Sequence, residues 1–330
     1  MKKLIALLLL LALLTGCTTA APETTPTTDP ALSATVTEAT QAPETTAATQ
    51  PTEETEVTEP TEPPVTIPTG PNTLRVHFID VGQADCMLLE CNNAYALVDA
   101  GYAETGDRVV QYLTDLGVQR LNLVVGTHPH ADHIGGMPDV LNAFPADNVW
   151  FSAIPYTNYT VNNFLNSVRK QGKNVIRPAN GQTFNLGGAT ITVLGPMKDN
   201  YEDVNDISLV LRVQYGDIRF LLTGDMESIA EHDLIDNNVD LKADVLKVGH
   251  HGSYSSTSYL FLRTVAPTYA VICVGAGNEY GHPHRDPLSR LEDADVTIYR
   301  TDIMYDIVAT TDGTDVYFQW GNQYAKPWTP

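Results

Sequence analysis

The sequence is poor in basic residues, which argues against one large class of function. Its 330 residues include 19 Lys and Arg but 40 Asp and Glu, for a formal net charge of −21. Broad nucleic-acid-binding surfaces depend on Lys and Arg to neutralise phosphates, so a basic nucleic-acid scaffold is not expected. An anionic substrate therefore requires a local positive charge, such as a metal ion.

Cysteine and long apolar runs are scarce as well. Four cysteines exclude a disulfide-dense scaffold and a cysteine-rich zinc module. Cys86, Cys91 and Cys273 are predicted to be buried free thiols, with a disulfide as the alternative. After residue 14, no stretch is long and apolar enough to cross a membrane.

The first 17 residues have the pattern of an export signal. Lys2 and Lys3 precede an apolar run, residues 4–14, which is too short to span a bilayer. Residues 14–17, Leu-Thr-Gly-Cys, resemble the bacterial lipobox. This resemblance implies a signal peptide over residues 1–16, a lipid on Cys17 and a location on the outer face of the bacterial cell membrane. An ordinary signal peptide with an incidental cysteine is the alternative.

Residues 17–72 are predicted to form a disordered tether behind the lipidated cysteine. Residues 18–70 contain 18 Thr, 9 Pro and nine acidic residues, but no Lys, Arg or aromatic residue. Such a segment buries too little apolar surface to offset the entropy lost on ordering, and proline and like charge keep it extended. The tether would hold a globular domain, residues 73–330, away from the membrane.

From residue 73 onward, short β-rich runs alternate with helical patterns, which predicts the α/β class. The expected strands are 74–79, 86–89, 95–98, 121–125, 190–194, 208–214, 218–222, 245–248 and 269–274. The expected helices are 107–116, 161–171, 226–236 and 287–294. The early strands form a hairpin-like group, so the sheet is not expected to be purely parallel.

A histidine cluster after the strand at 121–125 is the strongest functional signal. His128, His130, Asp132 and His133 fall within six residues. Alternate residues of an extended segment point the same way, so this loop can direct several side chains into one pocket. Imidazole suits zinc, and a carboxylate completes a mixed site. The cluster predicts a metal site, with a surface loop as the alternative.

This cluster resembles the His-x-His-x-Asp-His motif of the metallo-β-lactamase superfamily. Other motifs of that family occur in the expected order: residues 97–101 with Asp99, residues 223–225 with Asp225, and residues 247–253 with the paired His250 and His251. The resemblance implies an αββα four-layer sandwich, in which two mixed β-sheets are flanked by helices. It also implies two divalent metal ions, zinc in the first place and manganese as the alternative.

The resemblance further assigns the metal ligands residue by residue. The first metal would be bound by His128 and His130, and the second by Asp132, His133 and His251. Asp225 would bridge the two metals, and Asp99 would support the loop through hydrogen bonds.

The chain departs from the family at one ligand of the first metal. Many members carry an additional histidine there, but none occurs between His133 and His232. Asn205 is the expected substitute, directly or through water. The first site would then be weaker, and a harder ion such as manganese would become more favourable.

Further motifs resemble the extracytoplasmic hydrolase domain of the ComEC family of competence proteins. They are residues 78–85, which include Asp80 as structural support, residues 205–210 and residues 280–284. Ala84 stands where that family usually has glycine. In the family this domain is attached to a membrane channel, whereas here only the Cys17 anchor is expected to contact the membrane.

The resemblance implies a hydrolase in which a metal-bridging hydroxide, oriented by Asp132, is the nucleophile. His250 would contact a phosphate or protonate the leaving oxygen, and His282, His284 and Ser253 would bind substrate. The competence branch favours phosphodiesters in DNA, nucleotides or cell-wall polymers. The alternatives are hydrolysis of a teichoic-acid phosphocholine ester, a lactone or a β-lactam, or a noncatalytic surface lipoprotein that assists DNA uptake.

Overall fold

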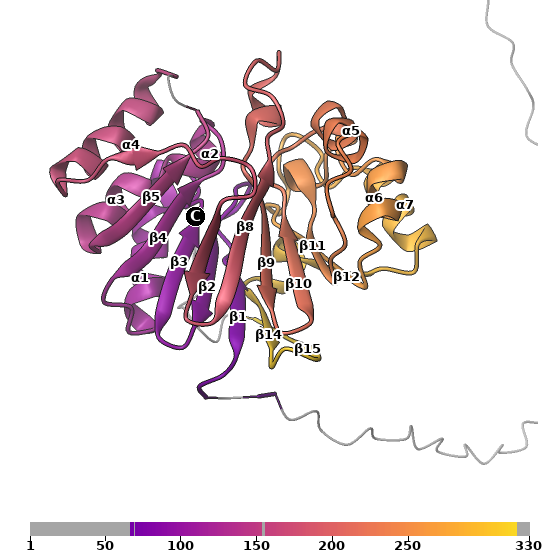
Figure 1. Cartoon of the computed structure of the whole chain (residues 1–330), viewed down its shortest axis with the longest axis horizontal. Helices are drawn as coiled ribbons and strands as arrows, with labels where there is room; N and C mark the ends of the chain where they lie inside the picture. Colours follow the sequence, from indigo (N-terminus) through magenta and orange to yellow (C-terminus); the bar gives the residue numbers. More distant parts are fainter. Residues whose placement is uncertain (1–66, 69, 154–155, 322–330) are drawn as a thin grey trace, which may run out of the picture. The chain divides into compact units, whose positions relative to one another are not determined.

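The computed structural model describes residues 67–68, 70–153 and 156–321. In this part, two β-sheets pack face to face, and helices cover the outer side of each (Figure 1). The predicted signal peptide, Cys17 and most of the tether lie outside the described residues and stay predictions. Within the described residues, no helix combines the length and apolar character needed to cross a membrane.

The first sheet contains eight of the described strands. In spatial order they are β15 (Val316–Trp320), β14 (Ile307–Thr311), β1 (Leu74–Phe78), β2 (Met87–Cys91), β3 (Ala94–Val98), β4 (Leu121–Gly126), β5 (Ala146–Phe151) and β6 (Val175–Ile176). Pairing is antiparallel from β15 to β3 and parallel from β3 to β6.

The second sheet contains seven of the described strands and repeats this division. In spatial order they are β13 (Thr297–Arg300), β12 (Tyr269–Ile272), β11 (Val245–Lys247), β10 (Ile218–Leu222), β9 (Val210–Tyr215), β8 (Ala189–Gly195) and β7 (Thr183–Leu186). Pairing is parallel from β13 to β10 and antiparallel from β10 to β7. Both sheets are therefore mixed, as expected.

The period-two alternation of strand side chains explains why the sheets are covered on both faces. In β2, Met87 and Leu89 point into the core between the sheets, whereas Leu88 points to the opposite face under the helices. Phe220 of β10 packs in the core between the sheets, and Leu221 faces the helices of the second sheet. Strands that are buried on both faces are rich in apolar residues, and β2 and β10 each contain a single charged residue, Glu90 and Arg219.

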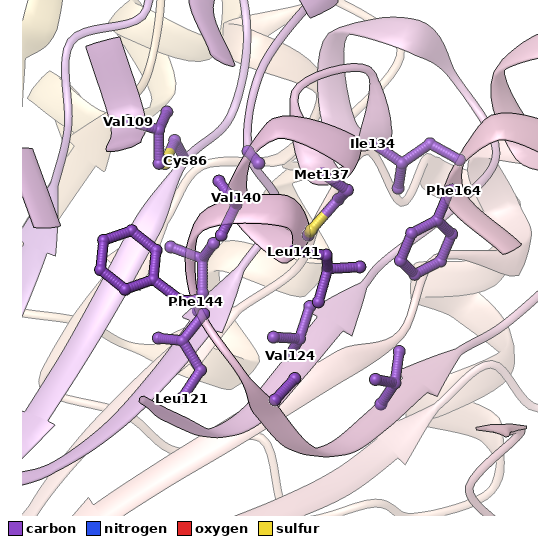
Figure 2. Packing of buried hydrophobic residues seen from close by; sticks show 14 of the residues in the cluster. Cys86, Val109, Leu121, Val124, Ile134, Met137, Val140, Leu141, Phe144 and Phe164 are labelled. Atoms are coloured by element: carbon purple, nitrogen blue, oxygen red, sulfur yellow. The ribbon is translucent and has the colours of Figure 1, made fainter. Parts of the chain in front are cut away.

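The longer helices form the two outer layers. The first sheet is covered by α1 (Gly106–Asp115), α3 (Met137–Ala143) and α4 (Tyr159–Lys170), and the second by α5 (Ser228–Asp236), α6 (Tyr259–Val265) and α7 (Arg285–Asp293). Figure 2 shows this packing on the first sheet, where Met137 and Val140 of α3 share a cluster with Val124 of β4. The predicted αββα sandwich is thereby confirmed.

Short helical segments lie at the ends of several strands. They are η1 (Ala103–Thr105), α2 (Ala131–Ile134), η2 (Val204–Ile207), η3 (Gly249–Gly252) and α8 (Thr301–Met304). Three of them, α2, η2 and η3, contain residues from the predicted metal motifs.

Most strand boundaries agree with the sequence prediction, and the exceptions have local causes. The strand at 218–222 is confirmed as β10, but β9 begins at Val210 rather than at 208. The backbone N–H of Leu209 donates instead to Thr127 O at 3.0 Å, which ties this segment to the histidine loop. Several elements were not predicted, because their sequences are short or rich in polar residues. They are helices α3 and α6 and strands β5, β7 and β13–β15.

The three described cysteines are buried free thiols, as predicted. Burial raises the pKa of Cys86 and Cys273 well above the usual thiol range, so both are neutral at pH 7.

Candidate metal centre

The predicted metal ligands lie at one edge of the two sheets because of the strand directions. The histidine loop follows β4, Asp225 follows β10 by three residues, and η3 with His250 and His251 follows β11. Strands β3 and β4 run parallel, as do β10 and β11, so each pair ends at the same edge of its sheet. Asp132 and His251, which are 119 positions apart in the chain, therefore meet.

Asp99, which directly follows β3, is hydrogen-bonded to two residues of the histidine loop. Its Oδ1 accepts the backbone N–H of Thr127 at 2.8 Å, and its Oδ2 accepts the Thr127 hydroxyl at 2.7 Å. Oδ2 also accepts Nδ1–H of His133 at 2.8 Å. All three residues are buried. Asp99 therefore supports the loop, and its contacts do not extend into the cavity.

The carboxylate of Asp225 lies at the centre of the site. Its Oδ2 is 3.2 Å from His133 Nε2 and 3.5 Å from His251 Nε2. The same oxygen is 3.8 Å from His250 Nε2 and 3.9 Å from His128 Nε2. Four imidazole nitrogens thus surround one carboxylate oxygen, which makes Asp225 the shared member of the site.

One half of the site, here called the inner half, consists of Asp132, His133 and His251 together with Asp225. Asp132 Oδ2 lies 3.3 Å from His251 Nε2 and 3.8 Å from His133 Nε2. The ligand atoms of these four residues all lie within 4.8 Å of one another. This spacing suits a single divalent cation with nitrogen and oxygen ligands.

The other half, here called the outer half, contains His128 and His130. Nε2 of His128 lies 3.1 Å from Nδ1 of His130. The Thr127 hydroxyl donates to Asp99, so at 3.2 Å it accepts a proton from His128 Nδ1. The lone pair of His128 Nε2 is thereby directed into the site.

Hydrogen bonds place the proton of the two inner-half histidines on Nδ1, as in His128. His251 Nδ1 donates to the carbonyl oxygen of Cys273 at 2.9 Å, and His133 Nδ1 donates to Asp99. Both residues therefore present Nε2 to the site. A histidine whose second nitrogen donates to a carboxylate or carbonyl is the usual form of a metal ligand.

Two residues beneath the inner half were not assigned a role from the sequence. Asp85 and Lys247 are fully buried, and their Oδ2 and Nζ atoms lie 2.7 Å apart. Asp85 Oδ1 is 3.4 Å from His251 Nδ1, and its Oδ2 is 4.0 Å from His133 Nδ1. Both residues occur in motifs that carried the family resemblance, but their pairing depends on β11 lying close to the loop after β1.

The inner half has strongly coupled charges. Burial alone would lower the pKa of His251, but the attraction of Asp225 and hydrogen bonds with Asp132 and Asp85 raise it to about 10. Burial alone would raise the pKa of Asp225, but His133 and His251 hold it well below its usual range. Metal binding at these nitrogens releases the protons that the carboxylates otherwise retain there.

The donor set fits the divalent metals implied by the family. His133 Nε2 and Asp225 Oδ1 are buried and make no hydrogen bond within the described residues. Such atoms are costly to bury unless another partner compensates them. Together with the converging Nε2 atoms, they match the nitrogen and oxygen ligands of zinc and related ions.

A cavity of about 320 Å³ opens over the site. Its lining includes the ligand candidates His130, Asp132, Asp225 and His251, and the neighbouring His250. The other lining residues are Gln83, Tyr102, Ala131, Tyr280 and His282, and none of the lining residues is Lys or Arg. The contribution of Gln83, Tyr102 and Tyr280 was not predicted from the sequence.

His282 has a defined orientation in this cavity. Gln83 Oε1 accepts Gly275 N–H at 3.1 Å, which leaves its amide nitrogen to donate to His282 Nδ1 at 3.2 Å. Burial and the positive charges of His251 and His250 lower the pKa of His282 to about 4. The neutral ring therefore carries its proton on Nε2.

The remaining predicted residues lie around the cavity rather than in its lining. His284 Nδ1 accepts Tyr254 N–H at 3.0 Å, and the Ser253 hydroxyl pairs with that of Ser255 at 2.8 Å. Asn205 is buried and helps to lower the pKa of Glu227, a residue to which the sequence assigned no role. Asp80 Oδ1 accepts Gly82 N–H at 3.1 Å and stabilises the turn after β1.

The fold and the arrangement of these residues define an αββα protein with a candidate metal centre, and the sequence comparison agrees. Residues 79–276 match the sequence profile of the metallo-beta-lactamase superfamily. The chain belongs to that superfamily.

Two curated proteins are similar in sequence to a large part of this chain. ComE operon protein 3 of Bacillus subtilis is 29% identical over 245 residues, which cover 69% of this chain and 32% of that protein. Competence protein ComA of Neisseria gonorrhoeae is 31% identical over 236 residues, which cover 70% of this chain and 31% of that protein. The chain thus spans about a third of the length of each relative.

A solved structure supports the fold independently. The metallo-beta-lactamase fold protein YhfI from Bacillus subtilis superposes with a TM-score of 0.50 at 13% identity. The superposition covers 76% of this chain and 99% of YhfI. At this level of identity the likeness bears on the fold alone.

Proposed function

We propose that this protein is a binuclear metal-dependent phosphodiesterase, anchored by a lipid on Cys17 to the outer face of a bacterial membrane. The observation that carries the proposal is the convergence of His128, His133 and His251 on one carboxylate oxygen of Asp225 beside an open cavity. The other oxygen of Asp225 is buried and has no hydrogen-bond partner within the described residues. The similarity to competence proteins favours a phosphodiester of DNA or a nucleotide as substrate.

The proposed metal ligands are those that the family motifs assign. When bound, two divalent metals supply Lewis acidity and lower the pKa of water toward about 7, which makes a nucleophile available at neutral pH. Asp132 and Asp225 are positioned to orient that water. Zinc is the first choice of metal, and manganese is the alternative.

Residues at the rim position the substrate. The proton on His282 Nε2 makes this ring a hydrogen-bond donor, and the Gln83 bond to Nδ1 keeps it in that form. A neutral donor can bind a phosphoryl oxygen before and during hydrolysis. His284 and Ser253 are proposed to contact longer substrates outside the cavity.

The charge distribution indicates the size of the substrate. The cavity lining has no Lys or Arg, and the whole chain carries a net charge of −21. Tight binding of long DNA depends on many contacts between basic side chains and phosphates. We therefore propose a nucleotide, a short or single-stranded DNA segment or a cell-wall phosphodiester as substrate, held mainly at the reacting phosphate.

The test is turnover by the purified full-length protein. We expect metal-dependent hydrolysis of bis(p-nitrophenyl) phosphate that disappears in His130→Ala and is unchanged in His232→Ala, whose side chain lies on the exposed surface of α5. Equal turnover in wild type and His130→Ala would contradict the proposal. Hydrolysis of nitrocefin or of a lactone in place of the phosphodiester would identify another bond as the substrate. Two bound metals without turnover would favour a noncatalytic accessory role.

A further inference from the structure

We infer that His250 is the missing third nitrogen ligand of the outer metal position, oriented by Glu227. This inference rests on the proposed binuclear centre and changes the role expected for His250 from the sequence. His250 would take the place of the histidine that other family members carry between the first motif and Asp225. The outer position would then have three imidazole nitrogens and the shared carboxylate.

The contacts of Asn205, the substitute expected from the sequence, place it behind His250. Asn205 is 5% exposed and does not belong to the cavity lining. Its side chain lies close enough to Glu227 to lower the pKa of that carboxyl, and Glu227 in turn contacts His250. Asn205 therefore supports the carboxylate that orients the histidine.

The two ring nitrogens of His250 have different surroundings. Nδ1 lies 2.9 Å from Glu227 Oε1, and the Ser255 hydroxyl donates to the same oxygen at 2.7 Å. A carboxylate accepts protons, so Nδ1 carries one and the Nε2 lone pair is available to a metal. This carboxylate–histidine pair has the form of the outer support found at metal-ligating histidines.

The position of Nε2 agrees with a shared metal. It lies 3.8 Å from Asp225 Oδ2, almost the same distance as His128 Nε2, at 3.9 Å. Two ligands of one tetrahedral ion with bonds of about 2.0–2.1 Å lie about 3.4 Å apart. Both distances to Asp225 Oδ2 are thus slightly longer than the separation expected for two ligands of one ion.

The backbone of η3 separates the two neighbouring histidines. His250 and His251 have φ values of 47° and 52°, both in the left-handed region that side chains with a Cβ rarely adopt. In this conformation His251 contacts Cys273 O and Asp132, whereas His250 contacts Glu227. A strained conformation persists only where surrounding contacts enforce it, and here it directs one ring to each half of the centre.

The metal preference follows from this ligand set. With His128, His130 and His250, the outer position is rich in nitrogen and selects ions of the zinc and cobalt type over manganese. The alternative role of His250, proton transfer to a leaving group, would leave the metal content unchanged when the ring is removed.

The decisive variant is His250→Gly, because glycine tolerates the left-handed φ at this position and the variant is expected to fold. The full-length protein is dialysed against zinc or cobalt, and the metal content per chain and the visible absorption of bound cobalt are measured. We expect two ions in wild type, one in His250→Gly and two in the control His232→Ala. Added imidazole should restore the second ion and its cobalt spectrum.

A second variant tests the orienting role of Glu227. In Glu227→Gln the histidine remains, but its anionic partner is lost, and we expect the affinity for the outer ion to fall by about 10–100-fold while the inner ion is retained. Two ions of unchanged affinity in both His250→Gly and Glu227→Gln would overturn the inference and leave the proposed hydrolase intact. A wild-type protein that binds no metal would overturn both.

Discussion

The two halves of the candidate metal centre share Asp225 but differ in what lies behind them. The inner half rests on fully buried groups: Asp99 supports His133, and the Asp85–Lys247 pair lies beneath His133 and His251. In the outer half, His128 is also buried and is supported through Thr127, but the His250 and Glu227 side chains that we assign to this half are 24% and 20% exposed. The two halves thus use similar ligand types, but different residues hold those ligands in place.

The first prediction concerns the buried support and has the largest expected effect on stability. Lys247→Met leaves the Asp85 carboxylate buried without its cation, and we expect the free energy of unfolding to fall by about 3–5 kcal/mol. Urea denaturation of the metal-free protein measures this. The double variant Asp85→Asn/Lys247→Met should recover part of the loss.

A matched surface pair provides the control for that experiment. Lys198 Nζ lies 2.7 Å from Asp233, but the Lys198 side chain is 53% exposed. Removal of this cation in Lys198→Met should change stability by less than about 1 kcal/mol, because water screens exposed pairs. Equal losses in Lys198→Met and Lys247→Met would mean that the buried pair contributes no special support.

The second prediction concerns the order in which metals leave. We expect a chelator titration to remove the outer ion at a concentration about 10–100-fold lower than the inner ion, since buried outer-shell partners raise metal affinity by this factor. Metal content at each chelator concentration is the measurement. In Asp85→Asn we expect the inner ion to leave at a lower chelator concentration, closer to the one that removes the outer ion. The surface variant Asp115→Asn in α1 should leave the two concentrations as far apart as in wild type.

One result would contradict this difference in metal affinity between the two halves. Loss of both ions in a single step from wild type would mean that Asp225 couples the two halves so strongly that their separate supports do not matter.

The third prediction concerns the rim of the cavity and has the smallest expected effect. Gln83→Ala removes the bond that keeps His282 Nδ1 an acceptor, and we expect KM for bis(p-nitrophenyl) phosphate to rise about fivefold, equivalent to one hydrogen bond of about 1 kcal/mol. The metal content should stay at the wild-type value. A fall in metal content would instead place Gln83 among the supports of the ligands.

The sequence predicted much of the fold because the strands that build its core are short apolar runs. The segments at 218–222 and 245–248 appear as β10 and β11 with little change of boundary. Strands such as β7 and β15 have mixed sequences, and pairing with their neighbours in the sheets stabilises them. Their existence could not be inferred from local pattern because cross-strand contacts determine it.

For the candidate site, too, the sequence predicted some residues and missed others. The histidine motif, Asp225 and His251 carry distinctive spacing, and the structure brings them together. Asp85 and Lys247 lie within recognised motifs and Glu227 does not, but in all three cases the sequence gives no sign of the partner that the side chain contacts. The substrate contacts expected of Ser253 and His284 stay predictions, and hydrogen bonds with Ser255 and Tyr254 hold these two side chains outside the cavity lining.

By itself, the sequence predicted the class of fold and a candidate metal site, since apolar periodicity builds strands and clustered histidines and carboxylates are typical metal ligands. Only the tertiary structure decided which side of Asp225 each histidine faces and which buried groups stand behind it. Those choices depend on the parallel ends of β10 and β11 and on the left-handed backbone of η3. Contacts between residues distant in the chain set the geometry of the site, and local sequence does not encode them.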